Sequence, residues 1–154
     1  MRSMLNIVLF EPEIPPNTGN VIRLATNTGA RLALIKPLGF RLDDKHLKRA
    51  GLDYREYADM QVYADWPSYL DSAQPHRVFA FSTKANTCYT EPRFRPDDAL
   101  LFGPETRGLP AELLESLPID QRLRIPMREN SRSLNLANAV SIATFEAWRQ
   151  MGFR

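Results

Sequence analysis

Short runs of apolar and β-branched residues alternate along this chain with segments whose apolar residues recur at helical spacing. The first pattern is typical of buried strands and the second of amphipathic helices. Together they predict an α/β fold with a mainly parallel sheet and helices on both faces. The predicted strands are Leu5–Phe10, Leu32–Ile35, Gln61–Tyr63, Val78–Phe81, Ala99–Phe102 and Arg122–Ile125, and the predicted helices are 17–28, 43–50, 67–72, 110–117 and 136–151.

Polar residues and prolines indicate where several helices begin. Asn17 or Thr18 is expected to cap the first helix, and Asp43 is expected to cap the second, because their side chains can accept a hydrogen bond from a free backbone N–H. Pro110 is expected at the first position of the fourth helix, where its missing N–H costs nothing.

The last predicted helix, Leu136–Met151, is apolar on most sides and has charged side chains only near its end. A helix of this kind has to be buried on most sides. Two explanations are open at this point: ordinary packing in the core of one subunit, or burial at an interface between two subunits.

Length and composition indicate one ordinary globular domain over residues 1–154, with 44% hydrophobic and 25% charged residues. The single cysteine, Cys88, excludes an internal disulfide, and with only His46 and His76 far apart in sequence no metal site is predicted. The apolar run Leu5–Phe10 is too brief for a signal peptide or a membrane span, so we expect a cytoplasmic protein.

The net charge is only +2, which gives no strong global attraction for nucleic acid. The basic residues are nevertheless 16 arginines and 4 lysines. Arginine suits bidentate contacts with phosphate, which favours an RNA partner. On composition alone, a GC-rich genome is the simpler explanation of the same bias.

Three polar loops follow predicted strands, at residues 11–20, 103–110 and 126–135. Each alone is explained as a turn or a helix cap. In open parallel sheets, however, ligands bind beyond the carboxyl ends of the strands, so three such loops at one edge predict a binding site. The chain lacks G-x-G-x-x-G, a P-loop, a nucleophile elbow and H-E-x-x-H. A standard dinucleotide-binding or P-loop mechanism is therefore unsupported.

The three loops resemble, in order and spacing, the three signature motifs of the SPOUT ribose methyltransferases. The matching runs are NTGNVIR at 17–23, FGPETRGLP at 102–110, and IP at 125–126 with SRSLNL at 131–136. The run KRAGLDY at 48–54 and the ending EAWR at 146–149 resemble the minimal single-domain branch of that superfamily. That branch methylates the wobble ribose, of cytidine or uridine, in certain leucine tRNAs.

The resemblance spans essentially the whole chain and implies several further features. It implies a C-terminal trefoil knot, a homodimer with the terminal helix and the first helix in the interface, and tRNA as substrate, with no metal and no membrane. It also implies S-adenosylmethionine as cofactor, bound within the knot largely by backbone groups. The cofactor-binding positions carried over by motif are Phe81, Gly103, Ile125, Met127, Ser133 and Leu134.

The same resemblance puts Arg23 at the reaction centre. Because a guanidinium stays protonated, with a pKa above about 12, we expect Arg23 to hold a neighbouring phosphate and stabilise the developing oxyanion rather than act as a base. Asn17 and Asn135 are expected to orient the ribose, and Glu105 to hold Arg23 or a loop amide. Two further arginines are expected to contact RNA phosphates: Arg107 and Arg132.

Two other classes of function compete with this interpretation. One is a knotted RNA-binding module without catalytic activity. The other is a small-molecule hydrolase that uses Glu105 and an arginine as an anion clamp, although no activated nucleophile or metal set accompanies them.

Overall fold

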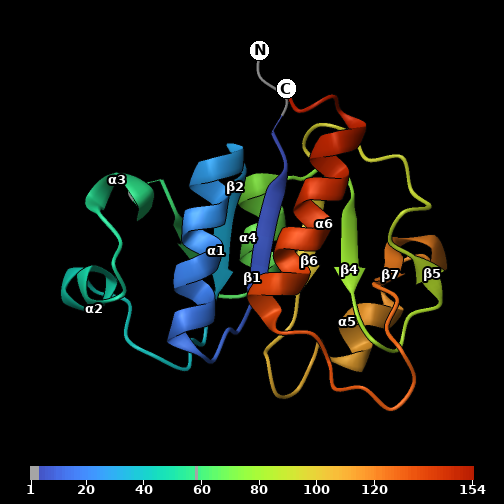
Figure 1. Ribbon diagram of the computed structural model, residues 1–154, viewed down its shortest axis with the longest axis horizontal. Coiled ribbons are helices and arrows are strands. Elements are labelled where there is room, and N and C mark those ends of the chain that lie inside the picture. The colour runs from blue at the N-terminus through green and yellow to red at the C-terminus, as the bar shows by residue number, and fades with distance from the viewer. Residues whose placement is uncertain (1–3, 58) are drawn as a thin grey trace.

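The computed structural model describes residues 4–57 and 59–154 of the chain. Within this part, seven strands form one sheet in the order β3-β2-β1-β6-β4-β7-β5, and every pairing is parallel (Figure 1). The predicted parallel α/β sheet is therefore confirmed. The strands are β1 Asn6–Phe10, β2 Arg31–Ile35, β3 Gln61–Tyr63, β4 Val78–Phe81, β5 Thr87–Cys88, β6 Ala99–Phe102 and β7 Arg122–Arg124.

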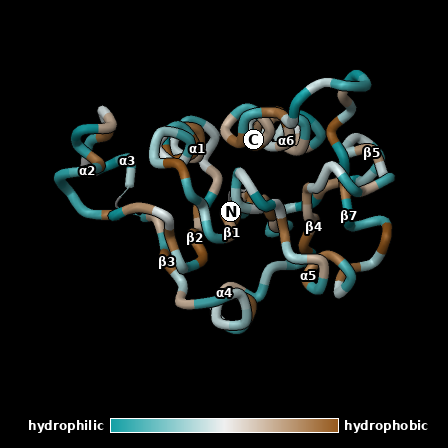
Figure 2. The backbone as a smooth tube through the Cα atoms, turned by 90° about the horizontal axis from the view of Figure 1, so that it is seen from below, coloured by the Kyte–Doolittle hydropathy of each residue, from teal (hydrophilic) through white to brown (hydrophobic). Residues whose placement is uncertain are grey.

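Helices cover both faces of the sheet, as predicted. Figure 2 shows α1 and α6 on one face and α4 and α5 on the other, with the sheet between them. In the described residues the helices are α1 Pro15–Thr28, α2 Asp44–Arg49, α3 Tyr54–Tyr57, α4 Trp66–Ala73, α5 Ala111–Glu115 and α6 Leu136–Gln150, together with a 3-10 turn, η1, at Ile119–Gln121.

Strand β1 runs through the centre of the core, and all five of its residues are buried. Because successive side chains of a strand point to opposite faces, Ile7 and Leu9 pack with the layer of α1 and α6, whereas Val8 and Phe10 pack with the layer of α4 and α5. Burial of each such side chain contributes about 1.5–3 kcal/mol. The continuous apolar run of β1 therefore joins both halves of the core.

Helix α1 begins earlier than predicted. Its first residue is Pro15, and Ile14 takes the N-cap position without a side-chain cap. Proline is tolerated in the first turn because its locked φ and missing N–H fit there. The prediction of a cap at Asn17 or Thr18 is therefore wrong: both lie inside the helix and are buried.

The other helix ends differ from prediction by less. Asp43 does cap α2, where its carboxylate accepts a hydrogen bond from the backbone N–H of His46 at 2.9 Å. Pro110 occupies the N-cap of α5 instead of its first turn. The short elements α3, β5 and η1 were not predicted, because two to four residues are too few to show a hydrophobic period.

The strand order changes direction beside β1. The chain continues from β1 to β2 and β3 on one side, whereas the other neighbour of β1 is β6. Loops leaving the carboxyl ends of strands on either side of such a switch point diverge and leave room for a ligand. Among the described residues, no helix has the length and apolar character needed to cross a membrane.

Candidate functional site

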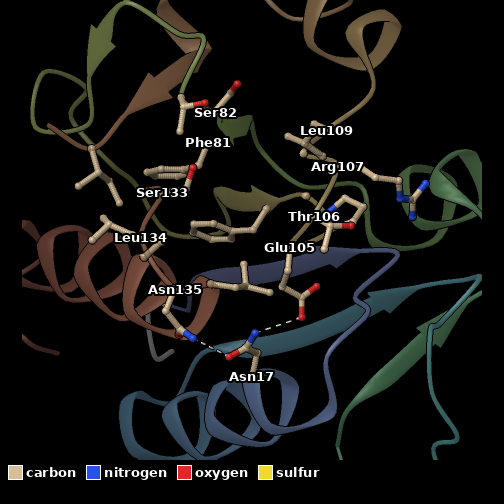
Figure 3. Close-up of a pocket in the computed structure, with 18 of the residues that line it drawn as sticks. Asn17, Phe81, Ser82, Glu105, Thr106, Arg107, Leu109, Ser133, Leu134 and Asn135 are labelled. Carbon is tan, nitrogen blue, oxygen red and sulfur yellow. Dashed lines mark hydrogen bonds between the residues drawn. The ribbon is translucent and has the colours of Figure 1, made fainter. Parts of the chain in front are cut away.

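The three polar loops meet at the carboxyl edge of the sheet and enclose a cavity of about 490 Å³ (Figure 3). This volume lies within the usual range for small-molecule sites, about 300–1,000 Å³. The ends of β4, β6 and β7, the loops that follow these strands and the starts of α1 and α6 form its wall. The lining residues are Ile14, Asn17, Phe81, Ser82, Thr83, Lys84, Phe102, Gly103, Pro104, Glu105, Thr106, Arg107, Gly108, Leu109, Arg124, Ile125, Met127, Ser133, Leu134, Asn135, Leu136 and Ala139.

Glu105 connects the loop after β6 to the start of α1. Its carboxylate accepts hydrogen bonds from the backbone N–H groups of Glu13 and Ile14, both at 2.8 Å, and from Nδ2 of Asn17 at 3.2 Å. Oδ1 of Asn17 accepts a further bond from Nδ2 of Asn135 at 2.9 Å, and Figure 3 shows this chain of contacts. One hydrogen-bonded network therefore joins all three loops.

Glu13 makes the opposite connection, from the loop after β1 to the loop after β6. Its Oε1 accepts bonds from the backbone N–H and the hydroxyl of Thr106, at 2.9 and 2.7 Å. These bonds, first from the backbone and then from the side chain of Thr106, lower the pKa of Glu13. Arg107 pairs with Glu13 at 3.5 Å and with Glu11 at 3.3 Å. The two loops are thus cross-linked in both directions.

Gly103 is a point of very close backbone packing in the wall of the cavity. A Cβ added there would lie 2.5 Å from the backbone nitrogen of Leu109 and 2.6 Å from the carbonyl carbon of Gly108. Neither backbone atom can move without displacing the loop, so only glycine fits. Nearby, the ring of Phe81 stacks on Phe102 with centroids 4.7 Å apart, which gives the cavity an apolar wall.

All six residues predicted to bind the cofactor line this cavity, and so do Asn17, Glu105, Asn135 and Arg107. Asn135 also caps α6, since its side-chain oxygen accepts a bond from the N–H of Asn138 at 3.3 Å. Arg23 and Arg132 are not among the lining residues. Arg132 is exposed, whereas Arg23 lies on α1 and forms an ion pair with Glu56 of α3 at 2.9 Å.

The sequence did not single out four polar lining residues, Ser82 to Lys84 after β4 and Arg124 at the end of β7. Arg124 donates a hydrogen bond to the carbonyl of Thr83 at 3.2 Å and so joins these two strand ends. Only their position in the chain could have indicated these residues. They lie at or just after the ends of predicted strands, and the carboxyl ends of those strands meet at this edge of the sheet. Lys84 and Arg124 add positive charge to the cavity. The carboxylate of Glu105, which also lines it, already accepts three hydrogen bonds.

The cavity lacks the groups that a hydrolase would need. In the described part of the chain there is no cluster of three or more His, Cys, Asp or Glu side chains that could hold a metal ion. The two hydroxyls at the end of β4, Ser82 and Thr83, have no histidine or free carboxylate among the lining residues to activate them.

Comparison with known proteins identifies the class. The model of the SpoU rRNA Methylase family matches residues 4–145, which is most of the chain. The protein therefore belongs to this family of RNA methylases, and the resemblance found in the three loop motifs is confirmed.

Individual relatives are more specific. A tRNA (cytidine(34)-2'-O)-methyltransferase of Yersinia pestis is 59% identical over 155 residues, covering 97% of this chain and 96% of that protein. A solved structure concerning the 2-OH methylation of C/U34 on tRNA shares 48% identity with a TM-score of 0.88, covering 99% of both chains. An AdoMet-bound rRNA methyltransferase of Sinorhizobium meliloti shares 26% identity with a TM-score of 0.82, over 97% of this chain and 58% of that one.

Proposed function

We propose that this protein transfers a methyl group from S-adenosylmethionine to the 2′-oxygen of the wobble nucleotide, cytidine or uridine 34, in leucine tRNAs. The observation that carries the proposal is the cavity built from the three family motifs, in a chain 59% identical to a tRNA (cytidine(34)-2'-O)-methyltransferase. Residues 1–154 act as one catalytic domain, in the cytoplasm where tRNA is modified.

The cavity suits S-adenosylmethionine in size and in wall chemistry. When bound, the cofactor supplies the electrophilic methyl group. Gly103 allows the loop at 103–110 to pack closely on itself, since a Cβ there would collide with Gly108 and Leu109, and Phe81 and Leu134 provide apolar wall for the cofactor. Ile125, Met127 and Ser133 complete the cradle. An AdoMet-bound relative with the same fold supports this assignment.

The ribose is oriented by Asn17 and Asn135. Each side-chain amide donates one N–H within the network of the three loops and retains a second N–H for a substrate oxygen. Glu105 fixes these two residues through the start of α1. Holding a hydroxyl and a methyl group in attack geometry can contribute roughly 7–11 kcal/mol to catalysis. Arg107 and Arg132, both exposed, contact RNA phosphates near the cavity.

The protein acts as a homodimer through α6. Packing in the core accounts for one side of this helix, which buries residues such as Val140, Ala143 and Ala147. The other side leaves Ile142 and Phe145 exposed, beside an aromatic cluster in which Trp148 contacts both Phe145 and Phe153. A second copy of the same face is the occupant that the family resemblance implies.

A dimer also explains the position of Arg23. Arg23 stabilises the developing oxyanion, yet it lies outside the cavity of its own subunit. It is exposed on α1, the helix that packs beside α6 on the same face of the sheet. We therefore assign Arg23 to the cavity of the partner subunit, so that each active site contains residues from both chains.

The C-terminal segment forms a trefoil knot. Strand β7 lies between β4 and β5, and the chain then returns so that α6 packs on α1 and β6. On the way, residues 125–135 pass the loop at 103–110, and both segments line the same cavity. This proximity of the two segments supports the knot that the family resemblance implies.

The proposal is tested by incubating the purified protein with radiolabelled S-adenosylmethionine and total tRNA from a strain that lacks the gene. We expect label in tRNA from that strain and none in tRNA from the parent strain, which is already methylated. Cofactor binding without label in either tRNA would instead support an RNA-binding module without catalysis.

A further inference from the structure

The segment between β2 and β3 takes no part in the cavity, although it contains the run KRAGLDY at 48–54. Its surface is largely exposed, and three buried side chains, Leu47, Leu52 and Tyr57, attach it to the core cluster beside α1. The hydroxyl of Thr26 on α1 adds a bond to the backbone carbonyl of Glu56 at 3.3 Å. The segment is thus held firmly against α1 at the level of Arg23.

Two groups of this segment hold the guanidinium of Arg23 from one side. Nε and Nη2 donate to the two carboxylate oxygens of Glu56 at 2.9 and 3.1 Å, and Nη2 also donates to the carbonyl of Gly51 at 2.7 Å. A guanidinium has five N–H donors. Three are used here, and the two on Nη1 make no hydrogen bond to the described part of the chain. The Arg23 side chain is 53% exposed, so Nη1 is open to a ligand.

We infer that Glu56, together with the carbonyl of Gly51, is the positioning residue that fixes Arg23 with Nη1 presented to the RNA. This inference rests on the proposed function, in which Arg23 meets the reacting ribose and its phosphate. A planar fork held by a carboxylate is ordered before the substrate arrives, so less conformational freedom is lost on binding. The KRAGLDY run provides the carbonyl of Gly51, and α3 provides the carboxylate of Glu56, that together hold the guanidinium of Arg23.

The ion pair also fixes the charge of Arg23. The hydrogen bond and the charge of Glu56 raise the pKa of Arg23, and the bond from Arg23 lowers the pKa of Glu56. Arg23 therefore acts only as a cationic donor. A purely stabilising role is a poor explanation for the pair, because an exposed ion pair contributes little to stability and buried side chains already attach α3.

The test is Glu56→Gln, which keeps the shape of the side chain and removes its charge. We expect kcat for tRNA methylation to fall roughly ten- to a hundredfold, while the Kd for S-adenosylmethionine and the melting temperature stay near wild type. Glu115→Gln is the matched control, since Glu115 is exposed on α5 and forms no ion pair within the described residues. This control is expected to retain wild-type kcat.

A double-mutant cycle separates positioning from any independent effect of Glu56. In an Arg23→Ala background, Glu56→Gln is expected to cause no further loss, because the group that it positions is gone. Wild-type kcat in Glu56→Gln, or an equal loss with and without Arg23, would overturn the inference. If the wild-type protein methylated no tRNA, the proposed function would be overturned, and this inference with it.

Discussion

Gly103 sets the shape of the cavity wall. Because it has no side chain, the backbone at 103 can pack directly against the backbone at 108–109 of the same loop. The Gly103→Ala variant would push these backbones apart, since the added Cβ would meet them at 2.5–2.6 Å. We expect at least a tenfold weaker affinity for S-adenosylmethionine, because the cradle can no longer close. Isothermal titration measures this loss.

Gly29 provides the matched control for that substitution. A Cβ at Gly29 meets nothing within 4 Å, although its φ of 78° makes alanine strained there. Gly29→Ala should therefore lower stability and leave cofactor affinity unchanged. Equal loss of affinity in both variants would mean that Gly103 acts through global stability and does not shape the site.

Sequence reasoning at the scale of residues succeeded for the cavity and failed for individual side-chain contacts between distant parts of the chain. The motifs brought Phe81, Gly103 and Ser133 to one cavity because motif spacing reports on the fold of a whole family. They did not indicate that Asn17 lies inside α1 and contacts Glu105, or that Arg23 is held by Glu56. Those partners are 88 and 33 residues apart in the chain, and no local pattern encodes such contacts.

At the scale of elements, α6 is the helix through which we propose that two subunits pair. Its outer side exposes 44% of Phe145 and 37% of Ile142, next to Trp148. The Phe145→Glu variant should convert the dimer to monomers, because burial of an aromatic side chain is worth about 1.5–3 kcal/mol per subunit and a buried unpaired charge adds a further cost. Analytical ultracentrifugation measures the change.

Ile119 offers a matched control for the interface. It is more exposed than Phe145, at 70%, and lies on η1, away from α6. Ile119→Glu is therefore expected to remain dimeric. If Ile119→Glu dissociated and Phe145→Glu did not, the interface would have to be placed on the other side of the molecule.

The elements found from sequence are those in which apolar residues form a continuous run or recur regularly over several positions. Six strands (β1, β2, β3, β4, β6 and β7) and the helices α1, α2, α4, α5 and α6 were placed within a few residues, because burial on one or two faces leaves a period of 2 or 3.6 in the sequence. Strand β5 has two residues and α3 has four, and their form depends on pairing with β7 and on packing against α1. Such elements are set by tertiary contacts.

At the scale of the whole molecule, stability should depend on pH in the acid range. The pKa values of Glu13, Asp43, Glu56, Asp65 and Glu146 are all lowered in the folded state, chiefly by hydrogen bonds to backbone N–H groups or to basic or hydroxyl side chains. A carboxyl whose folded pKa is lowered adds stability above its unfolded pKa, and this contribution is lost as the pH falls through the folded value.

We therefore expect the urea midpoint to be constant near neutral pH and to fall as the pH drops below about 4, the ordinary carboxyl range. Protein concentration must be fixed, because the proposed dimer would gain stability with concentration. Glu146→Gln removes one of these groups and should flatten the decline. A midpoint that stayed constant down to pH 3 would contradict the assigned hydrogen bonds.

Shared active sites can be tested by mixing two variants that are each inactive at a low concentration of S-adenosylmethionine. Arg23→Ala lacks the donor but has an intact cavity, whereas Gly103→Ala has the donor and a damaged cavity. If Arg23 acts in the partner's cavity, refolding equal amounts together should restore about a quarter of wild-type activity, because half of the dimers contain one complete site. Activity that never exceeds that of the two variants alone would place Arg23 in its own subunit's cavity.

The central claim is methylation of the ribose of nucleotide 34. The most direct measurement compares label uptake from S-adenosylmethionine by three ligated leucine tRNAs: an all-ribose molecule, one with a 2′-deoxynucleotide at position 34, and one with a 2′-deoxynucleotide at position 33. We predict label in the first and third and none in the second, because only the second lacks the accepting hydroxyl. Label in the tRNA without that hydroxyl would show that the methyl group goes elsewhere and would contradict the account.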